Sequence, residues 1–219
     1  VVTLEPCNHV GQTGPCALAL VEAGVSRVVF ASADPGDESS LGSRTLKDAG
    51  IEVIPGVLLE QAEEQNRVWL GSKRLGRPFV TLKWASTLDG RSAASDGTSQ
   101  WISGPESRAD THSRRANADS ILVGTSTAIA DDPELTARRP DGSYFEDQPI
   151  RIVWGESSIP NTLRLFNDKA KTMQSQTRDL DDAMHQLWAL GIKHVFVEGG
   201  PKLASAFVAA KLVDEFIVY

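Results

Sequence analysis

The sequence is short of cysteine, of basic charge and of long hydrophobic runs. Its 219 residues include 2 cysteines, and 29 acidic side chains outnumber 22 Lys and Arg, for a formal net charge of −7. Such an acidic chain argues against a general nucleic-acid-binding protein, which usually presents a basic face. No apolar run reaches the roughly 18 residues of a transmembrane helix, and the N-terminus lacks the signal-peptide pattern. We therefore expect a cytoplasmic protein that binds neither membranes nor nucleic acids.

The chain also lacks an initiator Met. It opens on the strand-like residues VVTLEP and ends on VDEFIVY, which has the pattern of a strand without a following turn. We expect the chain to be the interior of a longer protein. Its hydrophobic share of 41% is ordinary for a globular protein, and its length suits one large domain or two modest ones.

Apolar runs of strand length alternate with helical patterns, which is typical of an α/β fold with a largely parallel sheet. No element is assigned to the polar stretch 156–178, which has no clear period. The segment GSKRLGRP, residues 71–78, is rich in Gly, Pro and basic residues and is the expected domain boundary. The expected strands are 27–34, 51–54, 79–86, 120–124, 150–155 and 194–200, and the expected helices are 16–24, 41–49, 58–74, 107–118, 179–191 and 202–212.

Both cysteines lie in one turn, EPCNHVGQTGPC, which leads into the helix expected at 16–24. A pair of buried thiols, a disulfide and a redox pair remain alternatives, although the chain has no secretion signal and the spacing is not Cys-x-x-Cys. Zinc is favoured, because the unpaired amides of a first helical turn stabilise a thiolate. Two thiolates and one further protein ligand would leave the fourth zinc position open for water.

The zinc site is incomplete within this chain. A zinc deaminase combines a His-x-Glu half with a Pro-Cys…Cys half, and the Glu moves protons to and from the zinc-bound water. Here the second half has a longer loop and the first half is absent. Glu5 precedes Cys7 within the motif and cannot replace the missing Glu. His9 follows Cys7 by two residues, and we expect it to face the substrate rather than the metal.

Two strand-to-helix turns in the second half suit phosphate binding. VEGGPKLAS has a Gly-Gly turn before a Pro, and LVGTSTAIADDP offers the hydroxyls of Thr125, Ser126 and Thr127. Backbone amides at a helix N-terminus bind phosphate, but the same residue types are ordinary helix caps, so both interpretations stay open. Lys83 lies inside an apolar strand, where a lysine costs desolvation unless it meets an anion. We expect it to contact substrate or cofactor.

Four segments, in order, resemble one enzyme family. TLEPCNHVGQTGPCALALVEAGVSRVV is similar to the second half of the deaminase domain of the bifunctional riboflavin-biosynthesis deaminase-reductases, with Gly14 where the family usually has Pro. LKWASTLDGRSAASDGTSQWISGPESR, ANADSILVGTSTAIADDPELTAR and VFVEGGPKLASAF resemble the reductase domain. The resemblance implies a partial zinc cytidine-deaminase-like domain at 1–75. It implies a dihydrofolate-reductase-like α/β reductase domain at 76–219, truncated at its C-terminus, although no G-x-G-x-x-G fingerprint occurs.

The same resemblance implies ligands and site residues. It makes Cys7 and Cys16 ligands of Zn²⁺, with the third ligand and the proton-shuttling Glu upstream, and it places Lys83 and Asp131 at the reductase chemistry. The implied NADPH-binding residues are Ala85, Trp101, Thr127, Asp131, Gly200, Pro201, Lys202, Leu203, Ala204, Ser205 and Ala206. The implied binding residues for a phosphorylated pyrimidine substrate are Ser99, Arg115, Leu135, Arg138 and Glu198.

The cofactor preference stays open. Many relatives place an Asp and a hydroxyl residue near the cofactor where this chain has Gly155 and Glu156. A glutamate at that point would repel the 2′-phosphate that distinguishes NADPH from NADH. The sequence also leaves the oligomeric state open, a homo-oligomer included.

The activity implied by the resemblance has two steps. The first is zinc-dependent deamination of 2,5-diamino-6-ribosylamino-4(3H)-pyrimidinone 5′-phosphate, by attack of zinc-bound hydroxide on the amino-bearing carbon. The second is NADPH-dependent reduction of 5-amino-6-(5-phosphoribosylamino)uracil to the ribityl form. One alternative is a reductase with a remnant deaminase fold. Another is a nucleic-acid base deaminase with an appended binding domain, which the acidic charge disfavours, and a third is a zinc-stabilised scaffold that would unfold with chelator.

Overall fold

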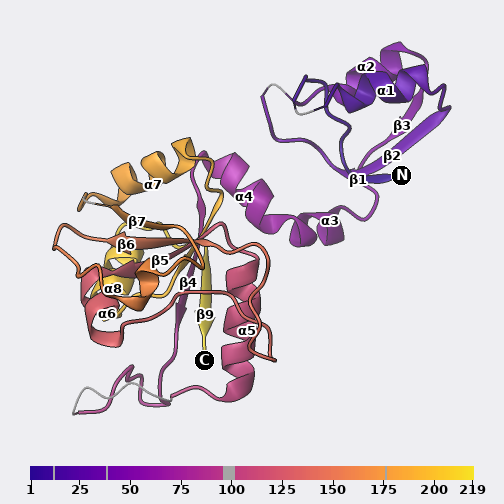
Figure 1. Ribbon diagram of the computed structural model, residues 1–219. Helices are drawn as coiled ribbons and strands as arrows, with labels where there is room; N and C mark the ends of the chain where they lie inside the picture. Colours follow the sequence, from indigo (N-terminus) through magenta and orange to yellow (C-terminus); the bar gives the residue numbers. More distant parts are fainter. Residues whose placement is uncertain (12, 38, 96–101, 176) are drawn as a thin grey trace. The chain divides into compact units, whose positions relative to one another are not determined.

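A computed structural model describes residues 1–11, 13–37, 39–95, 102–175 and 177–219. The chain divides into two compact units, Val1–Leu75 and Gly76–Tyr219 (Figure 1). The division falls within the segment 71–78, in which the sequence predicts a boundary. Gly76 has a φ of 65°, and a glycine in this left-handed conformation commonly ends a helix.

The first unit is built on a three-stranded parallel sheet in the order β1-β2-β3. Its core contains Ala17, Val28, Leu46 and Ile51, which come from the two helices between the strands and from the strands' ends. In chain order the elements are β1 (Val2–Leu4), α1 (Cys16–Glu22), β2 (Arg27–Ser32), α2 (Gly42–Asp48), β3 (Glu52–Ile54), α3 (Leu59–Gln65) and α4 (Arg67–Leu75).

The single helix expected for 58–74 is wrong. The structure has two helices, α3 and α4, that are separated at Asn66, whose φ is −105°. The Asn66 amide Nδ2 donates a hydrogen bond to the Ala62 carbonyl at 3.0 Å. Asn side chains compete for backbone groups in this way and favour helix ends over helix interiors.

The second unit contains a six-stranded sheet in the order β7-β6-β5-β8-β4-β9, in which every neighbouring pair is parallel. The chain runs outward from β5 to β7 and then returns, so that β8 lies between β5 and β4. The strands are β4 (Phe79–Trp84), β5 (Ser120–Gly124), β6 (Ile150–Trp154), β7 (Thr172–Ser175), β8 (His194–Val197) and β9 (Glu215–Val218).

Helices cover both faces of this sheet (Figure 1). One face packs α7 and α8 against a core that includes Leu122, Val197 and Phe207. The other face buries Ile121 and Val153 beside α6 and the 3₁₀ turn η1. The helices are α5 (Pro105–Ala116), α6 (Thr125–Asp131), η1 (Arg164–Phe166), α7 (Leu180–Ala189) and α8 (Pro201–Ala209).

The structure confirms the expected α/β fold with parallel sheets. The stretch 156–178, to which the sequence assigns no element, contains η1 and β7. β7 is a four-residue edge strand whose residues are all half-buried, so it lacks the alternation of buried and exposed positions that marks a strand in sequence. None of the described helices is long and apolar enough to cross a membrane.

Because the strands are parallel, their carboxyl ends meet at one edge of the sheet. Ligands of open α/β sheets bind in crevices outside this edge. The residues that follow β4, β5 and β8 are therefore the first place to search for a site.

Candidate active site

A pocket of about 790 Å³ lies at the carboxyl ends of β4 and β8 and at the start of α8. Among its described lining residues Lys83 is the single cationic side chain, and Asp131 and Glu198 are the two carboxylates. The lining residues are Leu82, Lys83, Trp84, Ala85, Gly90, Ser92, Ala93, Ile102, Thr127, Asp131, Glu198, Gly199, Gly200, Pro201, Ala204, Ser205, Val208 and Ala209.

The turn from β8 into α8 brings backbone to the pocket wall. No described side chain caps α8, whose first helical residue is Pro201, so the next amides of its first turn have no acceptor within the helix. A Cβ added at Gly199 would lie 2.4 Å from Leu203 Cδ2 and 2.8 Å from Leu203 Cβ. The close contact with the buried Leu203 requires glycine here, and Gly200 N donates to Thr127 Oγ1 at 3.2 Å, which joins the starts of α6 and α8.

Glu198 forms a two-bond ion pair with Arg115 of α5. Arg115 Nε lies 2.5 Å from Glu198 Oε1, and Arg115 Nη2 lies 3.0 Å from Oε2. Both side chains are nearly buried, at 13% and 10% exposed. Burial alone would raise the pKa of Glu198, but the charge and hydrogen bonds of Arg115, together with Lys83, hold that pKa below its ordinary value. Glu198 is therefore a carboxylate at neutral pH.

Lys83 lies where β4 reaches the pocket. Its Nζ is 4.0 Å from Glu198 Oε2 and 5.7 Å from the centre of the Tyr219 ring. The Tyr219 hydroxyl donates to Asp110 Oδ2, and Asp110 pairs with Arg114 at 2.7 Å. The Lys83 ammonium therefore lies beside the Glu198 carboxylate and the face of the Tyr219 ring, and it also lines the pocket.

A second group of basic side chains surrounds the segment after α6. His112 Nδ1 and Arg115 Nη1 both lie 3.0 Å from the Thr136 carbonyl oxygen. The pKa of His112 is lowered by burial first, and then by the charges of Arg115 and Arg138. Arg138 Nη1 lies 3.7 Å from Glu134 Oε2. This group holds more positive than negative charge and lies beside the Glu198 wall of the pocket.

Glu134 holds the same segment in place. Its carboxylate accepts hydrogen bonds from the Tyr144 hydroxyl at 2.8 Å and from Asn167 Nδ2 at 2.9 Å, and it pairs with Arg138 and Arg164. Burial opposes ionisation of Glu134, yet these hydrogen bonds and the two arginines lower its pKa overall. Glu134 therefore fixes one side of Arg138.

The structure brings together many of the residues predicted for the site. Lys83, Asp131 and Glu198 line the pocket, as do Ala85, Thr127, Gly200, Pro201, Ala204 and Ser205. Arg115 joins it through Glu198. Ser99 and Trp101 lie outside the described residues. The predicted residues that do not line the pocket are Lys202, Leu203, Ala206, Leu135 and Arg138.

Two of the residues predicted to bind ligands, Leu203 and Leu135, are packed in the hydrophobic core. Leu203 is 6% exposed and belongs to the core under α8. Leu135 is 3% exposed and packs with Ile121 and Val153; its φ of 49° turns the chain so that Thr136 and Arg138 reach the basic group. Neither leucine side chain has the exposure that a direct ligand contact would need. Each instead supports neighbours that do face the site.

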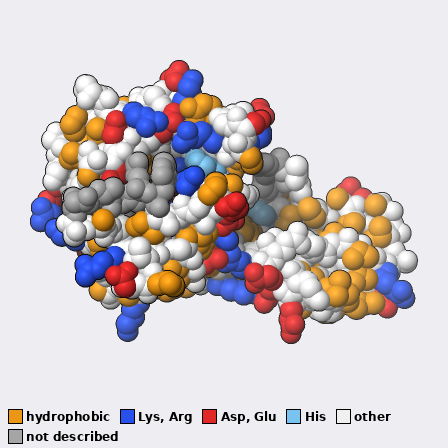
Figure 2. All heavy atoms as spheres, turned by 90° about the horizontal axis from the view of Figure 1, so that it is seen from below, with side chains coloured by type: hydrophobic (Ala, Val, Ile, Leu, Met, Phe, Trp, Pro, Cys, Tyr) orange, Lys and Arg blue, Asp and Glu red, His pale blue; other side chains and the backbone are white. Residues whose placement is uncertain are grey.

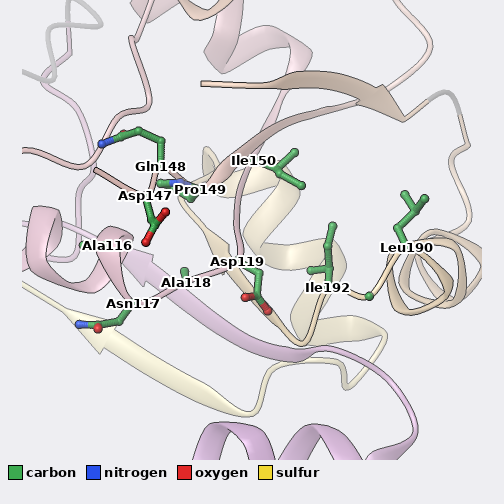
Figure 3. A pocket seen from close by; sticks show the side chains of 11 residues that line it. Ala116, Asn117, Ala118, Asp119, Asp147, Gln148, Pro149, Ile150, Leu190 and Ile192 are labelled. Carbon is green, nitrogen blue, oxygen red and sulfur yellow. The ribbon is translucent and has the colours of Figure 1, made fainter. Parts of the chain in front are cut away.

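A smaller pocket of about 400 Å³ lies at the opposite edge of the same sheet (Figure 3). It is lined by the residues that precede β5, β6 and β8, and Asp119 and Asp147 are its acidic members. Asp119 Oδ2 accepts hydrogen bonds from the backbone amides of Lys193 and His194 at 2.7 and 2.8 Å. That carboxylate oxygen is occupied in tying the start of β8 to the start of β5, so we assign Asp119 a structural role.

The first unit places its two cysteines together. Cys16 is the first residue of α1, and its backbone amide lies 3.4 Å from Cys7 Sγ. The Ala17 amide donates to the Cys7 carbonyl at 3.1 Å. The hydrogen bond from the Cys16 amide lowers the pKa of the Cys7 thiol, whereas the neighbouring Cys7 sulfur raises the pKa of Cys16. Both thiols are free.

Glu5 has a structural role in this unit. It is 6% exposed, and its two oxygens accept hydrogen bonds from the Ser43 amide at 2.9 Å and the Asp34 amide at 3.2 Å. A Cβ added at Gly42 would lie 1.8 Å from the Pro6 carbonyl oxygen, so only glycine allows α2 to approach the cysteine loop. Within the described ranges no group of three or more His, Cys, Asp or Glu side chains could hold a metal ion.

The surface face in Figure 2 mixes basic, acidic and hydrophobic side chains. Lys and Arg side chains occur in small groups with acidic residues between them. This face gives no support to a broad nucleic-acid interface, which would need a continuous basic surface.

Comparison with known proteins gives the family. Residues 78–219 match the model described as the RibD C-terminal domain. The chain belongs to the RibD family. Over its full length it is 50% identical to the riboflavin biosynthesis protein RibD of Mycobacterium tuberculosis and 37% identical to that of Escherichia coli, and it covers 64% and 67% of these proteins. The resemblance inferred from the sequence is confirmed.

Solved RibD structures have the same fold. The chain superposes on Acinetobacter baumannii RibD with a TM-score of 0.90 and 36% identity, covering 99% of this chain and 66% of that one. A Thermotoga maritima protein, described as a diaminohydroxyphosphoribosylaminopyrimidine deaminase/5-amino-6-(5-phosphoribosylamino)uracil reductase, gives 0.86 and 32% identity. It covers 95% of this chain and is itself covered to 64%. The chain thus spans about two thirds of its RibD relatives.

Sequence reasoning missed three residues that the geometry places near the site. His112 and Tyr219 have no motif that marks them, since each depends on a partner more than 20 positions away. Glu134 belongs to the quoted segment DDPELT, but its partners Tyr144 and Asn167 lie in loops without regular pattern. Only the folded arrangement shows why these side chains matter to this RibD-family chain.

Proposed function

We propose that Gly76–Tyr219 is the NADPH-dependent reductase of riboflavin biosynthesis, which converts 5-amino-6-(5-phosphoribosylamino)uracil to its ribityl form. The observation that carries the proposal is the pocket at the carboxyl ends of β4 and β8, where Lys83 and the Arg115–Glu198 pair meet the uncapped start of α8. The similarity to the Thermotoga maritima protein, a diaminohydroxyphosphoribosylaminopyrimidine deaminase/5-amino-6-(5-phosphoribosylamino)uracil reductase, supports the substrate class.

The residues present fit a dinucleotide. The free amides in the first turn of α8 suit a pyrophosphate, and Gly199 and Gly200 let that group approach the backbone. Glu156, which the sequence marks as unfavourable to a 2′-phosphate, lies 2.7 Å from Arg178 Nε. That cation offsets the charge of Glu156 and supports NADPH. When bound, the cofactor supplies a hydride to the sugar carbon.

The chain's own part is to hold the substrate and to stabilise charge. When C1′ of the ribose gains the hydride, its bond to the ring oxygen O4′ would break, and O4′ would take the bonding electrons and then a proton to become a hydroxyl of the ribityl chain. Lys83 is the cation that stabilises this charge, because its ammonium is held in the pocket by Glu198. Asp131 faces the same pocket from the end of α6, where we assign it to orienting the polar groups of substrate or cofactor.

The substrate's 5′-phosphate is assigned to the basic group of Arg115 and Arg138. Arginine suits a phosphate because its planar fork matches two oxygens. Glu198 already takes two bonds from Arg115, so Arg138 has the larger share of unused donors. We assign Glu198 the further role of accepting a hydrogen bond from the substrate in the pocket.

We further propose that Val1–Leu75 is the C-terminal part of a zinc deaminase domain. The supporting observation is the placement of Cys7 beside the first turn of α1, with its thiolate stabilised by the Cys16 amide. Two thiolates are half of a zinc site, and the remaining ligand and the His-x-Glu motif belong to the longer RibD protein. The residue pair would hold zinc, which activates water for deamination.

Two measurements test these assignments. For the reductase, equilibrium dialysis of NADPH against the chain should show one bound dinucleotide, with weaker retention of NADH. Absence of dinucleotide binding would reject the reductase assignment. For the deaminase, metal analysis of the full RibD-length parent should find one zinc per chain that is lost in Cys7→Ala and in Cys16→Ala. Zinc retained in both variants would reject Cys7 and Cys16 as ligands.

A further inference from the structure

His112 and Arg115 converge on one backbone oxygen. They lie one turn apart on α5, and the Thr136 carbonyl lies 3.0 Å from His112 Nδ1 and 3.0 Å from Arg115 Nη1. Because a carbonyl only accepts, Nδ1 carries the proton of this hydrogen bond. In a neutral imidazole the proton is then absent from Nε2, which is the atom that changes when His112 becomes charged.

Two polar atoms of the same chain segment have no partner. Within the part of the chain that the structure describes, Thr136 Oγ1 and Arg138 Nε are buried and make no hydrogen bond. Thr136 itself is 0% exposed. A ligand therefore cannot reach the Thr136 hydroxyl, whereas the Arg138 side chain is 35% exposed. Buried polar atoms are nearly always paired in folded proteins, so the unpaired N–H of Arg138 Nε indicates a missing acceptor. An anion is the acceptor that the charge of a guanidinium favours.

The charges around His112 also leave room for an anion. Arg115 faces it from α5, Arg138 from the segment after α6, and Glu198 from the turn after β8. Glu198 is matched by Arg115 and Lys83. Glu134, the carboxylate beside Arg138, is matched by Arg138 and Arg164. Four cations therefore surround two carboxylates, which leaves the group with excess positive charge. Burial and the two arginines lower the pKa of His112. A phosphate dianion placed among these groups would reverse that effect, because an opposite charge nearby favours the imidazolium.

We propose that His112 is a phosphate-binding residue of the substrate site, and that it takes up one proton from solvent when the phosphorylated substrate binds. The inference rests on the proposed function, since it assigns the substrate's phosphate to this basic group. In the free chain His112 is a neutral imidazole that donates through Nδ1 alone. In the complex it is an imidazolium that donates through Nε2 to a phosphate oxygen, beside Arg138.

The proposal has a measurable consequence. If binding takes up one proton, the affinity for a phosphomonoester falls as the pH rises. The fall is up to about tenfold for each pH unit, between the pKa of His112 in the free chain and its pKa in the complex. The second pKa of a phosphomonoester is about 6. At pH 7.5 the ligand is mainly the dianion, so net uptake at that pH comes from the protein.

The test is calorimetric titration of ribose 5-phosphate into the chain at pH 7.5, in two buffers of different ionisation enthalpy, which counts the protons taken up. The test variant is His112→Gln, whose amide N–H can still donate to the Thr136 carbonyl but cannot gain a charge. The matched control is His185→Gln. His185 is exposed on α7 and bonds a carbonyl of its own helix at 2.8 Å. Ribose serves as the ligand without phosphate.

Wild type and His185→Gln should take up a substantial fraction of one proton per ribose 5-phosphate. His112→Gln should take up close to none and bind about tenfold more weakly at pH 6.5. Equal proton uptake in wild type and His112→Gln would overturn the role of His112, while the substrate site itself would stand. Equal binding of ribose and ribose 5-phosphate by the wild type would overturn both the phosphate assignment and this inference.

Discussion

Arg115 and Glu198 lie 83 positions apart in sequence and are joined by two hydrogen bonds, of 2.5 and 3.0 Å. The pair links α5 to the turn after β8 and thereby sets one wall of the pocket. It also means that the Arg115 guanidinium already donates through Nε and Nη2 to Glu198 before a substrate binds. The family resemblance implies Arg115 as a substrate ligand, whereas the structure gives it a second role, which is to keep Glu198 ionised inside the pocket.

Glu198→Gln should destabilise the second unit by about 3 kcal/mol at pH 7, because removing one partner leaves a nearly buried guanidinium without its countercharge. The pKa of Glu198 is depressed in the folded state, so the stabilisation is present above its ordinary value of 4.5 and is lost as the pH falls through the folded value. Urea unfolding of both proteins, from pH 7 to well below pH 4.5, measures this. The gap between the two proteins should stay constant above pH 4.5 and narrow below it, and a gap that does not narrow below pH 4.5 would contradict the assignment.

Gly199→Ala should weaken NADPH binding by about tenfold, because its Cβ would lie within 3 Å of Leu203 and push the start of α8 out of place, at a typical overpacking cost of about 1–3 kcal/mol. Gly124→Ala is the matched control. Its added Cβ would meet the same Leu203 at 3.9 Å, which is an ordinary contact. Dialysis against NADPH compares the two, and similar losses in both variants would show that the contact with Leu203 is not the cause.

Glu134→Gln should raise KM for the phosphorylated substrate about tenfold and leave kcat within about twofold, since it loosens Arg138 without touching the reacting atoms. Tyr144→Phe is the companion variant, because it removes one hydrogen bond to the same carboxylate and keeps its charge. Its KM should rise less. A fall in kcat with unchanged KM in Glu134→Gln would place Glu134 at the chemistry instead.

The sequence predicts the alternation of strands and helices well, because buried parallel strands such as 120–124 are short continuous apolar runs. It does not predict the break at Asn66, where one side-chain hydrogen bond competes with an otherwise helical pattern. Nor does it predict β7, whose four half-buried residues show no alternation. The first miss arises where a local contact outweighs periodicity, and the second arises where no periodicity is present.

The residues of the candidate site also include some that the sequence predicts and some that only the fold reveals. Lys83 and the Gly-Gly turn are visible in sequence, because a lysine in an apolar strand and glycines before a helix break ordinary patterns. The pairing of Arg115 with Glu198 and the position of His112 depend on contacts of 83 and 24 positions' separation, which no local pattern encodes. In the first unit, the resemblance implies Cys7 and Cys16 as zinc ligands, which stays a prediction, and the structure adds the Cys16 amide, whose hydrogen bond lowers the pKa of the Cys7 thiol.

We propose that the pocket around Lys83 carries NADPH-dependent reduction of a phosphoribosylated pyrimidine. The most direct measurement is the loss of reduced-nicotinamide absorbance when the chain is given NADPH and 5-amino-6-(5-phosphoribosylamino)uracil, with Lys83→Ala beside Lys171→Ala as an exposed-lysine control. We expect turnover by the wild type and by Lys171→Ala, and a loss of at least about 100-fold in Lys83→Ala. Undiminished turnover in Lys83→Ala, or no oxidation of NADPH by the wild type, would contradict it.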